Sequence, residues 1–264
     1  MAPPKDIARS YPKRGLTADV GFRSEPKFCG DGSAEFNGTD QGAHVSNSYN
    51  CGASGAKTTI AAWFNSRDLS LSSNQTIACI AVDNTNSRLG VYTTATGEVA
   101  ASAGLSSGFI KVSTGNVLEE NQWYFVAGTL DADSAAIKIY VDGIEYNQSP
   151  TSGLGGTNNT FEVGFRENSG SALQHFDGHL ANVMVIEDVL TQSEIIELML
   201  ETTLAKAQTF GTVNRFYLLD SNFNDSANSH NLTEVNSPSF TVDRPQLPRG
   251  LDLARGAAMA RVQT

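Results

Sequence analysis

Short apolar runs separated by clusters of turn-forming residues extend from about residue 33 to residue 235. In TTIAAWFNS (58–66), Ile60 and Ala62 fall on one face and Ala61 and Trp63 on the other. Similar runs begin about every ten to fifteen residues, which predicts strands of an all-β sandwich or jelly roll rather than βαβ units. The other runs are 33–36, 43–46, 76–82, 88–94, 98–104, 108–114, 122–130, 159–165, 178–188, 214–220 and 230–235.

The clearest local signal is the segment IKIYVDGIEYN (137–147). Apolar and polar residues alternate on both sides of Asp142-Gly143, which is a strong signature of a β-hairpin with a type I′ turn. That turn needs positive φ at both central residues, which Asp tolerates and Gly prefers. We therefore interpret Asp142 as a turn residue and expect Glu145 to be solvated, so the hairpin marks the fold rather than a site.

One segment has helical instead of strand periodicity. LTQSEIIELMLETTLA (190–205) places Ile195, Leu198 and Met199 at helical spacing, and Thr191 with Glu194 forms a capping box. The sequence predicts one short helix over residues 191–202, closing the sandwich.

Charge divides the chain into three parts. The net charge is −10, yet residues 1–15 carry +3 and residues 243–264 carry +2, which leaves −15 on the middle. A non-specific nucleic-acid binder needs a basic face along its body, so an acidic body argues against direct nucleic-acid readout. We predict a basic N-terminal arm (1–15), one β domain (16–242) and a C-terminal arm (243–264).

The basic residues of the two arms are the predicted contacts with protein partners. Arms that become ordered on a neighbouring subunit can wrap its surface without a core of their own. These candidates are Lys5, Arg9, Lys13, Arg14, Arg244, Arg249, Arg255 and Arg261.

The sequence contains neither a membrane-length apolar run nor the apolar core of a secretory signal peptide. Its cysteines, Cys29, Cys51 and Cys79, are few, odd in number and widely spaced. We expect buried thiols in a protein made in a reducing cytoplasm, with one disulfide left as an alternative.

Several motifs in order resemble the laminin-G-like, concanavalin A-like jelly-roll family. They are AEFNGTD (34–40), WYFVAGTLD (123–131), IYVDGIE (139–145), FEVG (161–164), FDGHLANVMV (176–185) and LTQSEII (190–196). The likeness covers about residues 30–200, and residues 215–240 resemble a further strand pair of the family. It implies a large antiparallel sandwich in which 215–240 completes a sheet, and it implies nothing catalytic.

No catalytic motif accompanies this resemblance. The E-x-D-x-x-E pattern that places two carboxylates on one strand face for glycoside hydrolysis does not occur. The four histidines lack zinc-site spacing, and we expect His175 and His179 to be surface or strand-edge residues. We predict a protein that is not an enzyme, with a glycoside hydrolase as the least favoured alternative.

Calcium is the one ion that the sequence suggests, and no other cofactor is expected. The segment DSNFND supplies Asp220, Asn222, Asn224 and Asp225, side chains of the type that Ca²⁺ prefers. The same residue types form turns with their own backbone, which is the favoured interpretation here. A second and weaker candidate is Asp131 with Asp133. For glycans, Tyr49, Phe109 and Tyr146 are stacking candidates by position alone.

These observations favour a bacteriophage virion protein, either a capsid decoration or a tail appendage subunit. The family is usually extracellular, whereas this chain shows no export signal, and a virion leaves its host by lysis. We expect a homo-oligomer that contacts other virion proteins and no membrane. The alternative is a carbohydrate-binding adhesin module that recognises host or environmental glycans.

Overall fold

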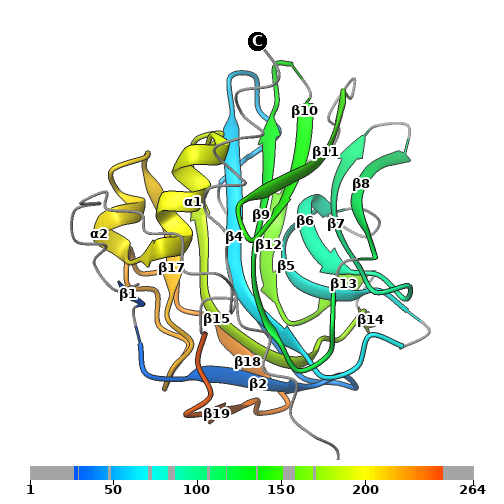
Figure 1. Ribbon diagram of the computed structural model, residues 1–264, viewed down its shortest axis with the longest axis vertical. Helices are drawn as coiled ribbons and strands as arrows, with labels where there is room; N and C mark the ends of the chain where they lie inside the picture. The colour runs from blue at the N-terminus through cyan, green and yellow to red at the C-terminus, as the bar shows by residue number, and fades with distance from the viewer. Residues whose placement is uncertain are drawn as a thin grey trace, which may run out of the picture.

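Two antiparallel β-sheets packed face to face form the body of the protein (Figure 1). This computed structural model describes residues 27–28, 30–46, 49–70, 73–82, 87–105, 108–116, 118–134, 136–150, 158–168 and 171–245. The all-β sandwich expected from the alternating runs is confirmed, because a strand forms at almost every predicted run.

The first sheet has eight strands. Its order is β11 (Ile144–Pro150), β10 (Ala136–Val141), β9 (Trp123–Asp131), β4 (Lys57–Ser66), β15 (Asp177–Ile186), β2 (Ser33–Asn37) and β19 (Ser239–Thr241). The eighth strand, β17 (Val213–Tyr217), pairs with the far half of β15, beyond the end of β2.

The second sheet has seven strands. Its order is β18 (Thr233–Val235), β3 (Gly42–Ser46), β12 (Asn158–Val163), β5 (Gln75–Val82), β6 (Ser87–Thr93), β7 (Glu98–Leu105) and β8 (Gly108–Asn116). Two small pairs complete the strands: β1 (Lys27–Phe28) lies parallel to β16 (Glu201–Thr202), and β13 (Arg166–Asn168) forms a hairpin with β14 (Ser171–Leu173).

The eight-stranded sheet is buried on both faces, because alternate side chains of β4 belong to two different cores. Ile60 and Phe64 point into the core between the sheets, whereas Ala61 and Trp63 point to the opposite face. There they meet Ile195 of helix α1 (Gln192–Leu200) and other apolar side chains of the second core. The alternation within this run thus separates two cores rather than a core and solvent.

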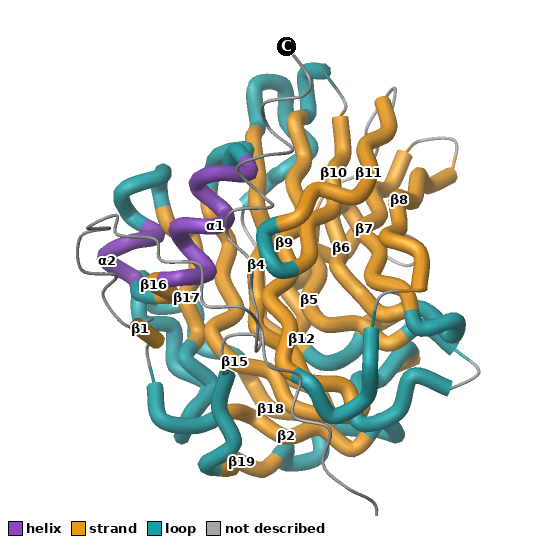
Figure 2. The backbone as a smooth tube through the Cα atoms, viewed as in Figure 1, coloured by secondary structure: helices purple, strands orange, loops and turns teal. Residues whose placement is uncertain are grey.

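Helices α1 and α2 (Leu204–Ala207) lie together on the outer side of the eight-stranded sheet (Figure 2). The expected capping box is present, with Thr191 as N-cap and Glu194 bonded back to it. The helix is shorter than predicted, because Glu201 and Thr202 leave it to pair with β1 as β16. The short helix α2 was not predicted.

The hairpin of 137–147 forms as expected, with β10 and β11 joined by Asp142 (φ 50°) and Gly143 (φ 76°). Its tip packs on helix α1: the Gln192 side chain donates a 2.9 Å hydrogen bond to the Gly143 carbonyl. A β-carbon on Gly143 would lie 2.5 Å from Ile196. The hairpin therefore also fixes the position of the helix.

Residues 215–240 return to the sandwich, as the family resemblance implied, but they contribute to both sheets. β17 and β19 belong to the eight-stranded sheet and β18 to the seven-stranded sheet. The two rings of Phe161 and Tyr217 stack across the core at 5.9 Å between centroids. This segment therefore joins the two layers at one end.

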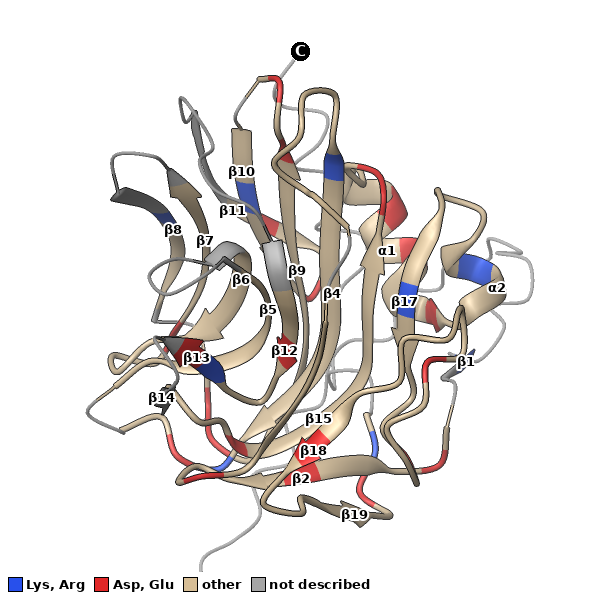
Figure 3. Ribbon diagram, turned by 180° about the vertical axis from the view of Figure 1, so that it is seen from behind, with Lys and Arg blue, Asp and Glu red and all other residues tan. Residues whose placement is uncertain are grey.

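Asp and Glu residues are spread along the described ribbon, with fewer Lys and Arg residues among them (Figure 3), in keeping with the acidic middle of the sequence. Within the described residues, no helix is both long enough and apolar enough to cross a membrane. Cys51 and Cys79 are buried thiols, as expected, while Cys29 lies outside the described residues.

Candidate functional site

A continuous row of residues crosses the outer face of the seven-stranded sheet. Strand register places them side by side, and their sequence neighbours Phe161, Ile80 and Leu89 point into the core. In order across β3, β12, β5, β6, β7 and β8 the row is His44, Glu162, Cys79, Gly90, Ser102 and Lys111. Small residues occupy the middle of this row and polar residues its two ends.

Glu162 is the unusual member of the row, because its carboxylate is fully buried. It accepts hydrogen bonds from the Thr160 hydroxyl at 2.6 Å, the Glu167 amide at 3.0 Å and the Cys79 thiol at 3.4 Å. Burial raises the pKa of Glu162 above its usual range, although these bonds oppose the shift. Its contact with Glu167 holds strand β13 of the β13–β14 hairpin against the sheet.

Beyond Gly90 the row reaches a polar patch on β6, β7 and β8, which we define as Tyr92, Glu98, Ser102 and Lys111. The Tyr92 hydroxyl is hydrogen-bonded to Ser102 and lies near the charge of Arg166, while burial raises its pKa. Lys111 is 3.9 Å from the Glu98 carboxylate. An aromatic ring among donors and acceptors of both charges is suited to a neutral or charged ligand rich in hydroxyl groups.

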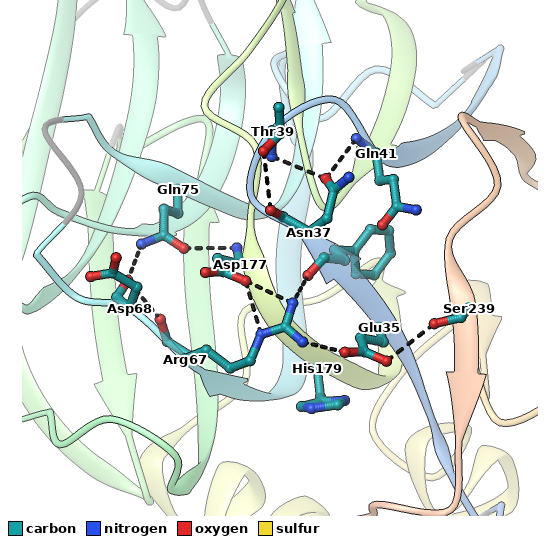
Figure 4. Close-up of polar contacts among 12 residues, drawn as sticks. Glu35, Asn37, Thr39, Gln41, Arg67, Asp68, Gln75, Asp177, His179 and Ser239 are labelled. Carbon is teal, nitrogen blue, oxygen red and sulfur yellow. Dashed lines mark hydrogen bonds and ion pairs between the residues drawn. The ribbon is translucent and has the colours of Figure 1, made fainter.

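A second polar cluster surrounds Arg67, which follows β4 (Figure 4). Its guanidinium group pairs with Glu35 on β2 and with Asp177 on β15, where the Nη2–Oδ1 distance is 2.7 Å. It also donates to the Phe36 carbonyl. One side chain therefore ties together the ends of three strands.

This cluster brings two carboxylates together, but neither is free for acid–base work. Burial acts to raise the Glu35 pKa, yet hydrogen bonds from Arg67 and Ser239 outweigh it, and the pKa lies below its usual range. A general acid needs the opposite shift. The Asp177 amide also donates to Gln75 at 2.9 Å, so the cluster braces the strand ends.

The predicted calcium residues form a turn. Asp225 accepts hydrogen bonds from the amides of Phe216, Ala227 and His230, so its carboxylate stabilises the loop itself. Asn222 accepts from the Asn224 amide at 2.8 Å.

The remaining member of that set, Asp220, accepts from the Ser221 hydroxyl and lies against Gly30. Asp131 likewise accepts from the amides of Asp133 and Ser134. Within the described part of the chain, no group of three or more His, Cys, Asp and Glu side chains is arranged to hold a metal ion.

Two of the three predicted aromatic glycan contacts, Tyr49 and Tyr146, have described side chains, and these lie in different parts of the fold. The Tyr49 hydroxyl donates to the Lys57 carbonyl at 2.7 Å, and burial raises its pKa to about 12. Tyr146 is 37% exposed at the far edge of the other sheet, on β11. The side chain of Phe109 lies outside the described residues. Their role in binding stays a prediction.

Of the eight basic arm residues, the structure describes Arg244 alone. It pairs with Asp31 at 3.1 Å, and both side chains are largely exposed. Lys5, Arg9, Lys13, Arg14, Arg249, Arg255 and Arg261 lie outside the described residues.

Two expectations about single residues were wrong. His179 is not at the surface or at a sheet edge, because it lies on the central strand β15 with a side chain 14% exposed. Glu145 is not simply solvated, since it accepts from Lys138 at 3.1 Å and from the Tyr140 hydroxyl at 2.8 Å. His175 is half-buried and contacts the Gln41 carbonyl at 2.9 Å.

Sequence reasoning did not identify Glu162, Tyr92 or Arg67. Alternation in FEV could have placed Glu162 on an outer strand face, opposite Phe161 and Val163. Nothing local shows that β13 covers it, because that contact depends on the path of the chain after Gly164.

Comparison with known proteins agrees with the architecture. Residues 37–196 match the family described as the concanavalin A-like lectin/glucanases superfamily, Laminin_G_3. A search of curated protein sequences gives no match.

Among solved structures, a putative carbohydrate-binding protein from Bacteroides ovatus superimposes with a TM-score of 0.59 at 18% identity, covering 83% of this chain and 60% of that one. A heptameric SAP-like pentraxin from Limulus polyphemus gives 0.51 at 16%, covering 64% and 82%. The CBM40 of a Ruminococcus gnavus sialidase, bound to α2,3-sialyllactose, gives 0.50 at 16%, covering 63% and 96%. At these identities the likeness establishes the fold alone. With the family match over more than half of its length, this chain belongs to the concanavalin A-like lectin/glucanases superfamily.

Proposed function

We propose that this protein is a non-catalytic carbohydrate-binding module that binds glycans on the outer face of its seven-stranded sheet. The observation that carries the proposal is the row ending in the polar patch of Tyr92, Glu98, Ser102 and Lys111. The patch offers hydroxyl, ammonium and carboxylate groups beside the edge of an aromatic ring that is 8% exposed. A sugar-binding site needs apolar contact with the face of the sugar ring as well as hydrogen bonds to its hydroxyl groups.

The structural neighbours support this assignment by analogy. Two of them are a carbohydrate-binding module in complex with a sialylated sugar and a putative carbohydrate-binding protein. A shared sandwich fold does not determine which ligand a protein binds. The patch is therefore the main support for glycan binding, and the structural neighbours add to it by analogy.

The absence of catalysis is part of the proposal. Two carboxylates that lie near each other, Glu35 and Asp177, share Arg67, and the buried Glu162 accepts a hydrogen bond from the β13–β14 hairpin. A retaining glycosidase needs one carboxyl group held protonated and a second free as nucleophile.

The test is a glycan array with the full chain, with and without EDTA. Lys111→Ala and Tyr92→Phe should weaken binding to any glycan that the native protein retains. Lys138→Ala is the matched control, since Lys138 is also a partly exposed lysine paired with a glutamate, but on the other sheet. Equal loss in Lys138→Ala and Lys111→Ala, or no retained glycan at all, would refute the proposal. The comparison with and without EDTA separates calcium-dependent from calcium-independent binding.

The virion role expected from the sequence stays a prediction. Of the eight basic arm residues, Arg244 is the one that the structure describes, and its pairing with Asp31 is within the chain. Mass spectrometry of purified phage particles, if the source encodes such particles, is the direct measurement.

A further inference from the structure

The segment after β19 crosses the outer face of the eight-stranded sheet and is held there by a few specific contacts. Its Asp243 carbonyl accepts a 2.7 Å hydrogen bond from the Ser33 hydroxyl. The Asp243 carboxylate accepts from the Trp123 indole at 3.3 Å and lies 4.0 Å from His179 Nε2. Asp243 therefore reaches from β2, the neighbour of the edge strand β19, to β9, three strands away.

The surface under this segment is a row of four outward-facing residues. Register places Glu35, His179, Asn65 and Trp123 side by side across β2, β15, β4 and β9. Trp123 is 9% exposed and Asn65 6%. The buried amide oxygen of Asn65 accepts no hydrogen bond from any residue that the structure describes, so the segment does not use this acceptor.

Close approach of the segment depends on Gly32. A β-carbon at this position would lie 2.2 Å from the Thr241 carbonyl oxygen, which is closer than atoms can approach. Gly32, Ser33, His179, Asn65 and Trp123 together form a site shaped for an extended peptide that carries an aspartate. We call these five residues the strap site.

Every contact between the segment and the strap site joins residues far apart in the sequence. β19 pairs with β2, and the two side chains beside the Asp243 carboxylate, Trp123 and His179, lie on β9 and β15. The nearest covalent link is the turn at Asn236 and Ser237, both at positive φ (54° and 51°). A non-glycine residue in this conformation is strained, most clearly for Ser237.

The turn is held closed by few bonds. Gln41 donates to the carbonyls of Asn236 and Ser237, and the Asn236 side chain donates to the Asp40 carbonyl. All three bonds are exposed. The same segment could reach the strap site of another copy if this turn opened, with identical contacts and less backbone strain.

We propose that two copies of this chain exchange the segment Ser239–Arg244, each placing its Asp243 in the strap site of the other. Exchange of an identical element is a low-cost route to a dimer, because each copy recovers the contacts that it gives up. A short connection under strain favours such exchange, and here only three residues, 236–238, join β18 to β19, two of them at positive φ. The partner is therefore a second copy, and the exchanged segment leads directly into the C-terminal arm.

A disulfide trap tests this in the full chain. Thr241 and Ser33 are direct cross-strand partners with hydroxyl oxygens 3.3 Å apart, a pairing that a disulfide can bridge. The variant Ser33→Cys/Thr241→Cys is made with two different tags, mixed, incubated over a range of concentrations and oxidised. Ser33→Cys alone controls for links to native cysteines.

Exchange predicts covalent dimers that contain both tags, in a fraction that rises with protein concentration. Gly32→Ala should abolish the links within and between chains, and Ser237→Gly should lower the exchanged fraction by relieving the strain of the closed turn. A disulfide found only within single chains at every concentration would overturn the proposal, as would folded protein in which no disulfide forms.

Discussion

Two hydrogen bonds join Asp142 at the hairpin tip to the backbone of Phe125 on β9. The Phe125 amide donates to Asp142 Oδ1 at 2.9 Å, and the Asp142 amide donates to the Phe125 carbonyl at 2.8 Å. Asp142 thus does more than tolerate a left-handed turn, because its carboxylate closes the end of the neighbouring strand. That carboxylate is largely desolvated, and burial raises its pKa to about 6.

This relationship predicts how stability depends on pH. Well below pH 4 Asp142 is protonated in both states, whereas between about pH 4 and 6 the native state holds a proton that the unfolded state has largely lost. The free energy of unfolding should therefore fall as pH rises through this window, by on the order of 2 kcal/mol from this group. Asp142→Asn keeps the acceptor and the turn preference, so it should be more stable than the native chain at pH 7 and equal to it near pH 4. Urea unfolding at both pH values measures this, and a constant difference between the two proteins would contradict it.

Gly143 and Gly55 form a matched pair for the contact between the hairpin and helix α1. Both have positive φ, 76° and 79°, but a β-carbon on Gly143 meets Ile196 whereas one on Gly55 meets nothing within 4 Å. Gly55→Ala should cost about 1 kcal/mol for backbone conformation alone. Gly143→Ala should cost about 1–2 kcal/mol more, because Ile196 must move. Equal losses in urea unfolding would show that the hairpin does not position the helix.

Arg67 should matter more for stability than an exposed ion pair. Arg67→Met leaves Glu35 and Asp177 facing each other without their shared cation, and we expect a loss of about 1–2 kcal/mol, allowing for partial exposure. Lys27→Met removes the exposed pair with Glu201, where both side chains are more than 40% exposed, and should cost less than about 0.5 kcal/mol. Thermal or urea unfolding of both variants decides whether the network braces the strand ends.

Glu162 should control the β13–β14 hairpin without controlling the fold. Glu162→Ala removes the acceptor for the Glu167 amide, and hydrogen exchange at that amide should speed up several-fold. Glu162→Gln retains an oxygen acceptor and should keep most of the protection. The Gly164 amide, which donates to Ile77 at 3.1 Å, is the internal control. Unchanged exchange at Glu167 in the alanine variant would mean that other contacts hold the hairpin.

The candidate sites were harder to foresee than the fold. The strands, the hairpin turn and the capping box each depend on residues within a few positions of one another, so local patterns predicted them. The patch at Tyr92 and the cluster at Arg67 depend on register between strands that are up to 110 residues apart. The proposed calcium residues lie within six positions of one another, and in the structure Asn222 and Asp225 form hydrogen bonds within a turn, which is the interpretation that the sequence favoured.

The sequence by itself determined the class of fold, the position of its hairpin and the start of its helix, because period-two alternation, Asp142-Gly143 and Thr191 with Glu194 are local signals. Only the tertiary structure decided that Trp63 faces a second core, that Glu162 is buried beneath β13 and that Asp243 reaches Trp123. Alternation tells which residues share a face of a strand. What covers that face is decided by segments that return from elsewhere in the chain.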